Sequence, residues 1–246
     1  HICVYLFYKC ERNKLEMKNN LRISTLEIIS GMVKENVITG EDLKQFINND
    51  DENQPEFIRI EMEKWYKGLG IEALTGQPFT LKLPYFSKEE IVEAKKNGNM
   101  ILCVPKGINK ALLGELFHFD SWALHNSLIT NTEEAEDFWF ITKNELMPEN
   151  RDLQGRQIKQ IYGREGKLGM SLERYLVFAA RTRYLYNKLP DTSSSTWLLN
   201  GKYEKSAFLI AGFDSERKLA IHAWLPQFHS PKVGSRYVVI PEHLYI

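Results

Sequence analysis

A capped helix followed by three candidate strands, near the C-terminal end, constrains the fold more than any other stretch of this sequence. Ser171 is suited to cap "LERYLVFAARTRYLYNKL", Glu173 falls in its first turn, and Pro190 marks its end. The candidate strands are residues 207–211, 219–225 and 237–240. "GFDSERK" is predicted to turn the first of them into the second, which gives a helix packed with an antiparallel hairpin.

A second pattern of strands and helices precedes this one. Ser87 and Glu90 form a capping box for a helix that runs to residue 96, where Gly98 is suited to end it. Strands are predicted on both sides of that helix, at 80–83 and 100–104, as a small β-α-β unit. A helix over 108–117 and a strand over 138–142 complete a predicted α/β domain at 71–150.

The first 70 residues are predicted to form a helical segment. Apolar residues recur at helical spacing in three stretches, 23–36, 39–46 and 55–69. Met17 opens a stretch that reads like a bacterial start, so residues 1–16 are either not native or an alternating edge strand, and both interpretations stay open. The apolar run at the start is too short to span a membrane.

Residues 151–169, rich in glycine and basic residues, are predicted to be a loop or linker. The predicted fold class is therefore α+β, with a helical segment (1–70), a small α/β domain (71–150) and a C-terminal module (151–246).

Composition excludes some partners and compartments. Thirty-two basic residues balance thirty-two acidic ones, so the chain as a whole has no field that would steer it to nucleic acid or to an anionic membrane. Cys3, Cys10 and Cys103 are an odd number without paired spacing, which argues against a disulfide framework and favours a reducing compartment. We therefore expect a soluble, cytoplasmic protein that has no membrane partner.

Few residues suggest chemistry. His118, Asp120 and His125 are metal-ligating types, but their spacing matches no metal signature, and a His at a helix end usually interacts with the helix dipole. The serines of "TSSST" lack a nucleophile motif, and no phosphate-binding loop, dinucleotide fingerprint, zinc-protease or calcium motif occurs. The sequence favours a protein that is not an enzyme and has no metal or cofactor, with a hydrolase centred on these three residues as an alternative.

A basic stretch offers a second alternative. Residues 151–188 hold nine Lys or Arg against three acids, with four tyrosines among them. This composition suits phosphate contacts, so a nucleic-acid-associated protein stays open beside the simpler interpretation of a basic linker and an amphipathic helix.

The run 219–225 carries the candidate binding residues. Its alternation places His222 and Trp224 on one face, and the loop "LPQFHSP" follows. Exposed aromatic residues tend to mark recognition sites, although a second layer could cover Trp224 instead. The predicted ligand-binding residues are His222, Trp224, Gln227 and His229.

The order of a helix, "TWLLNG", "SAFLIAGF", an alternating strand and "VGSRYVVIP" resembles the end of the C-type lectin-like fold. It is similar to formylglycine-generating-enzyme-like domains and to the variable proteins of diversity-generating retroelements. The matching positions are Trp197, Gly201, Gly234 and Arg236. The resemblance implies that Trp197 is a core residue, Gly234 a backbone requirement and Arg236 a structural cation.

Two departures limit what the resemblance implies. The paired cysteines of the oxidising enzymes are missing from this region, so that activity is not expected. The Asn-rich variable strands are missing too, since Asn200 is the one Asn after Asn187. What remains is a scaffold that displays a binding surface for an unknown protein or small ligand. Alternation after Gly234 also predicts that the Arg236 guanidinium is buried and satisfied by loop carbonyls or a carboxylate.

Overall fold

The structure is a computed structural model, and it describes residues 54–129, 135–204 and 207–241. The described residues belong to one compact unit of mixed helices and strands, so the fold class is α+β. The predicted helices at 23–36 and 39–46, and residues 1–16, lie outside the described residues.

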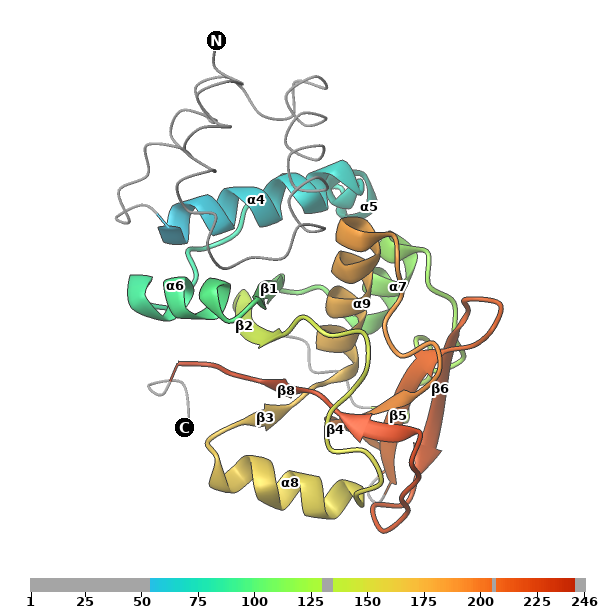
Figure 1. Cartoon of the computed structure of the whole chain (residues 1–246). Helices are drawn as coiled ribbons and strands as arrows, with labels where there is room; N and C mark the ends of the chain where they lie inside the picture. The colour runs from blue at the N-terminus through green and yellow to red at the C-terminus, as the bar shows by residue number, and fades with distance from the viewer. Residues whose placement is uncertain (1–53, 130–134, 205–206, 242–246) are drawn as a thin grey trace. The chain divides into compact units, whose positions relative to one another are not determined.

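The elements follow one another as in Figure 1. The helices are α4 (Gln54–Gly68), α5 (Ile71–Thr75), α6 (Lys88–Lys96), α7 (Lys110–Phe117), α8 (Gly155–Arg164) and α9 (Leu172–Tyr186). The strands are β1 (Asn99–Val104), β2 (Phe138–Lys143), β3 (Leu168–Gly169), β4 (Ser195–Tyr203), β5 (Ala207–Phe213), β6 (Leu219–Trp224), β7 (Val233–Ser235) and β8 (Tyr237–Val238).

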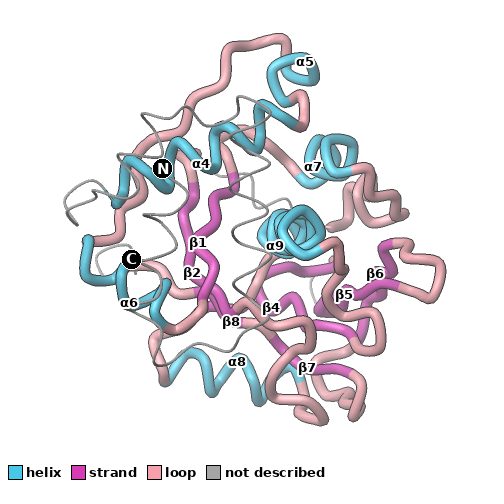
Figure 2. The backbone as a smooth tube through the Cα atoms, turned by 45° about the horizontal axis from the view of Figure 1, so that its top comes forward, coloured by secondary structure: helices cyan, strands magenta, loops and turns pink. Residues whose placement is uncertain are grey.

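Three sheets organise the described residues. The largest has the order β6-β5-β4-β7, in which β4 pairs antiparallel with β5 and parallel with β7. Two antiparallel ribbons accompany it: β1-β2, which runs beside α4 in Figure 2, and β3-β8, which is labelled in Figure 1. A bridge between Ile141 and Val239 joins the β1-β2 ribbon to the end of the chain, so the segments predicted as separate modules share one hydrophobic core.

Several local predictions are confirmed. The Ser87 side chain accepts a hydrogen bond from Glu90 N, and the Glu90 side chain accepts one from Ser87 N, as a capping box requires. Ser171 caps α9 by accepting from Arg174 N. The hairpin between β5 and β6 also forms, with Asp214 accepting backbone hydrogen bonds within the turn.

The strand predicted at 80–83 is wrong. This segment forms no strand with any other described segment, and carboxylates accept hydrogen bonds from two of its backbone amides. Leu81 N donates to Glu63 Oε1 at 2.7 Å, and Lys82 N donates to Asp137 Oδ2 at 2.6 Å. Side-chain acceptors satisfy these two amides as the hydrogen bonds of a strand pair would, and the predicted β-α-β unit does not form.

The linker predicted at 151–169 is also wrong, because α8 lies inside it. Gln157 Oε1 accepts from Gln154 N at 3.0 Å, which helps to start the helix. Ile158 and Tyr162 follow at a spacing of four and are both buried against the sheet. Of the four glycines that suggested a loop, two lie within α8, at its first and its last-but-one position, where they disturb it least.

The four-stranded sheet is covered on both faces. The pairing register places Leu198, Leu209 and Ile221 on the face that joins the main core with α9. Trp197 and Ile210 lie on the other face, in a second core to which α8 contributes. Helices α9 and α8 therefore lie on opposite sides of this sheet (Figure 1).

The expected burial of Arg236 is confirmed, and its partner is Asp191. The two side chains are 3% and 0% exposed. Arg236 donates from Nε to Asp191 Oδ2 at 3.1 Å and from Nη2 to Oδ1 at 2.7 Å, while Nη1 donates to the Glu145 carbonyl at 2.7 Å. Tyr175 and Thr196 donate their hydroxyls to the same carboxylate, at 3.0 and 2.8 Å.

Gly234 lies where another chain segment comes too close for a side chain. A Cβ there would be 2.2 Å from the Glu149 carbonyl oxygen and 2.9 Å from Arg151 Cγ. Glu149 and Ser235 exchange backbone hydrogen bonds of 3.0 and 2.7 Å beside this point. At Gly201, in contrast, a Cβ would meet its nearest neighbour at an ordinary 3.6 Å.

Replacing Arg236→Ala should lower the free energy of unfolding by about 3–5 kcal/mol, because Asp191 would keep a buried charge without its partner. Denaturant melts of this variant and of wild type measure the difference. Arg164→Ala, which removes an exposed arginine, is the matched control and should change stability by less than about 0.5 kcal/mol. Equal effects of the two substitutions would contradict this account.

Gly234→Ala should destabilise the fold by at least about 2 kcal/mol, because the added methyl group would overlap the Glu149 carbonyl. Gly201→Ala should cost less than about 1 kcal/mol, since its Cβ has room. Thermal melts of the two variants side by side test the contrast. If Gly234→Ala leaves the melting temperature unchanged, residues 148–151 do not pack as closely against Gly234 as described.

Candidate functional site

Two segments of the chain form one surface beside the second core. Residues 151–164, which include α8, meet residues 222–232, the end of β6 and the loop after it. Asp152 N donates to Ser230 O at 3.2 Å, and Arg156 N donates to Pro226 O at 3.1 Å. We call the exposed side chains of these two segments the α8 surface.

The α8 helix is held tightly on the sheet. The Tyr162 hydroxyl and Ser235 Oγ share a buried hydrogen bond of 2.6 Å. A Cβ at Gly155 would be 3.0 Å from the Phe208 ring and 3.3 Å from the Trp197 indole, so the first turn of α8 lies directly against these rings. The sheet therefore determines where the outward side chains of α8 lie.

Three aromatic rings connect the second core to the surface. The rings of Trp197 and Trp224 are 5.9 Å apart and those of Trp224 and Phe228 are 6.3 Å apart, both close to perpendicular. Trp197 is fully buried, Trp224 is half-buried, and Phe228 is 52% exposed. Edge-to-face contacts of this kind stabilise aromatic pairs beyond their buried area, so Phe228 is a supported but exposed ring.

The four predicted ligand-binding residues lie on one strand and the loop after it. His222, Gln227 and His229 are exposed, and His229 Nδ1 lies 2.9 Å from Asp152 Oδ1. Trp224 is not the exposed residue that we expected, because the second layer covers part of it. Its place at the surface is taken by Phe228.

Sequence reasoning missed other members of the α8 surface. Phe228 and Leu225 are exposed apolar side chains of the loop, and Arg156 and Lys159 project from α8. One signal was present in the sequence. Phe228 is an aromatic residue in a short segment between Pro226 and Pro231, where a turn is expected and burial is not.

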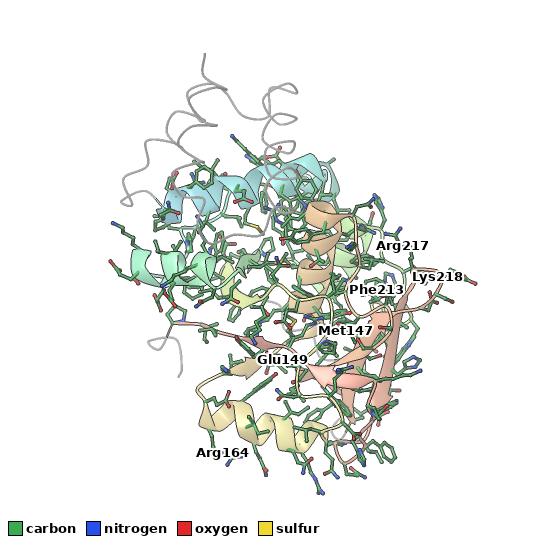
Figure 3. All side chains as sticks on the ribbon, in the orientation of Figure 1. Met147, Glu149, Arg164, Phe213, Arg217 and Lys218 are labelled. Carbon is green, nitrogen blue, oxygen red and sulfur yellow. The ribbon has the colours of Figure 1, made fainter. Side chains whose placement is uncertain are left out.

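The α8 surface is strongly basic. It carries five exposed cations against one acid, Asp152, which lies beside His229. The cations are Arg151, Arg156, Lys159, Arg164 and Lys232. Arg164 marks one end of this surface, at the last turn of α8 (Figure 3).

Beyond α8, most cations of the basic segment 151–188 are buried or half-buried, and Lys188 is the exposed one. Arg174 and Arg181 are buried, and Arg181 pairs with Glu61. Arg183 donates to the Phe117 carbonyl. The predicted patch over the whole segment is thus too large: its exposed cations are concentrated around α8.

The three residues of the hydrolase alternative are exposed. His118 ends α7 in the left-handed conformation, with φ of 53°. Across residues 54–129, 135–204 and 207–241, no group of three or more His, Cys, Asp or Glu could hold a metal ion. Of the "TSSST" hydroxyls, those of Ser194 and Thr196 lie against Asp191, in the structural network of Arg236.

Comparisons with known proteins add no assignment: no family model, no curated protein and no solved structure matches the chain. Among the described residues, none of the helices has the length and apolar character needed to cross a membrane.

Alkaline pH should weaken the attachment of α8. Burial is the main cause that raises the pKa of Tyr162 from 10.0 to about 12. Folding therefore favours the protonated phenol, and its contribution is complete below pH 10 and is lost as pH rises to 12. The stability advantage of wild type over Tyr162→Phe should shrink by up to about 3 kcal/mol across this interval. Denaturant melts of both proteins at pH 9 and pH 12 measure the change, and a constant difference would contradict it.

Proposed function

We propose that this chain is a binding protein without catalytic activity, and that its α8 surface takes up a partner. The exposed ring of Phe228 carries the proposal. An aromatic side chain that is 52% exposed loses contact with water when a partner covers it, and aromatic residues supply much of the energy at such interfaces.

The support beneath Phe228 favours binding over chance exposure. Phe228 N donates to Leu225 O at 3.0 Å within the loop, and its ring rests on Trp224. The loop is joined to the α8 segment by the hydrogen bonds from Asp152 and Arg156. A ring fixed in advance loses little conformational entropy on binding.

We also propose that residues 151–246 have a C-type lectin-like fold. Three features support this: α9 precedes a sheet in which β4, β5 and β6 are antiparallel, Trp197 is fully buried, and Gly234 and Arg236 occupy the closing strand segment in structural positions. A scaffold of this type, also used by retroelement variable proteins, would display a surface for a protein or small ligand. We place this activity in the cytoplasm of a bacterium.

Capture experiments with three forms of the protein test the binding role. Immobilised wild type, Phe228→Ala and Leu83→Ala are exposed to extract of the native host. Leu83 is 51% exposed but belongs to the segment at 80–83, outside the α8 surface, so its replacement is the control. We expect a component that wild type and Leu83→Ala retain and that Phe228→Ala loses at least about tenfold, as for an interface hot spot.

Phe228 is a sharper test than Trp224, because Trp224→Ala would also remove a ring contact of the second core and cost about 2 kcal/mol of stability. Phe228→Ala should cost less than about 1 kcal/mol, since much of its ring is in water. Equal recovery of every captured component on all three forms would contradict the proposal.

A further inference from the structure

We propose that the partner of the α8 surface is a single-stranded nucleic acid, an inference that rests on the binding role proposed above. The strand would place its phosphates on the cations of α8 and one of its bases on Phe228.

The first argument is local charge. The whole chain is neutral, yet the α8 surface has five exposed cations and one acid, a net charge of +4 if the histidines are neutral. That acid, Asp152, lies 2.9 Å from His229 and so has a polar neighbour already. Such a concentration of positive charge attracts a polyanion and releases the counterions bound to it.

The second argument is that cations and aromatic rings lie side by side. The amide of Arg156 is bonded to Pro226, two residues before Phe228. Lys159 Nζ lies 5.6 Å from the centre of the Phe208 ring, and Phe208 pairs with Trp224 across the sheet. One ligand could therefore contact the charges of α8 and the ring of Phe228 together.

These two features together favour a single strand over other anions. Every nucleotide carries a phosphate and a flat base, so charge and a stacking surface repeat along the whole ligand. In a duplex the bases are stacked inside and cannot cover an exposed ring. An acidic protein segment supplies negative charge at residues that offer no ring to stack, so it would use the cations and leave Phe228 uncovered.

Fluorescence anisotropy with labelled oligo(dT) of twelve nucleotides tests the inference on the full chain. If about four phosphates are contacted, raising salt from 50 to 200 mM should weaken binding about fiftyfold, because log K falls with log[salt] with a slope of about −0.7 per phosphate. The comparison probes are a twelve-residue poly-Glu peptide, which has a similar charge, and a short duplex.

Substitutions separate the two kinds of contact. Arg156→Glu with Lys159→Glu should weaken oligo(dT) binding at least about tenfold and reduce the salt slope by about 1.4, the share of two phosphates. Phe228→Ala should weaken binding about tenfold with the slope unchanged, and Phe228→Trp should restore it. The control is Lys96→Glu with Lys188→Glu: both lysines are exposed, and both lie outside the α8 surface. It should bind like wild type.

Other outcomes overturn the inference. Binding of poly-Glu with the same dependence on Arg156 and Lys159, but none of oligo(dT), would identify an acidic protein partner and leave the binding role intact. Equal affinity for the duplex would exclude base stacking on Phe228. If neither oligo(dT) nor poly-Glu binds, the nucleic-acid inference is wrong. A component that host extract yields through Phe228 would then still support the proposed binding function. If no such component is captured, the binding function is contradicted as well.

Discussion

The paired hydrogen bonds between Arg236 and Asp191 are the contact on which the C-terminal half of the structure depends. Asp191 has a φ of 52°, a left-handed conformation that is uncommon outside glycine, and its carboxylate also accepts the hydroxyls of Tyr175 and Thr196. Its own amide donates to Leu146 O, and its carbonyl accepts from Phe213 N. Helix α9, strands β4 and β5, and the loop after β2 thus meet at one buried residue, Asp191, through its carboxylate or its backbone. A buried ion pair contributes only when its remaining hydrogen bonds are made, as they are here.

This contact also determines where the α8 surface lies. Arg236 follows Ser235, whose backbone pairs with Glu149 and whose hydroxyl meets Tyr162 on α8. Loop 144–150 is fixed from the other side by the Arg236 bond to the Glu145 carbonyl. Loop 144–150, which precedes α8, is therefore bonded to Arg236 and Ser235, and Tyr162 of α8 is bonded to Ser235. The same few hydrogen bonds around Arg236 and Ser235 thus stabilise the core and hold α8 in position.

Local signals in the sequence predict most of the elements, because capping and periodicity act over one or two turns. These local signals were enough to predict helices α4, α6 and α9 and the hairpin of β5 and β6. The segment at 80–83 shows the limit. Its alternation is that of a strand, but Glu63 and Asp137, 18 and 55 residues away from the amides they bind, take the place of a neighbouring strand. Spacing along the chain does not reveal such distant acceptors.

The two errors at the candidate site have one cause. The alternation of β6 correctly separates the face of Trp224 from that of Ile221, but it cannot say what covers each face. On the face of Trp224, the covering core includes residues of α8, which lies within the stretch interpreted as a linker. Trp224 packs against the second core and meets the rings of Trp197 and Phe228, so Phe228 is the more exposed ring. The backbone amide of Arg156 on α8 donates to Pro226 O, two residues before Phe228. Two sequence features that favoured different functions, the strand with Trp224 and the first part of the basic segment, therefore lie on two chain segments that hydrogen bonds join.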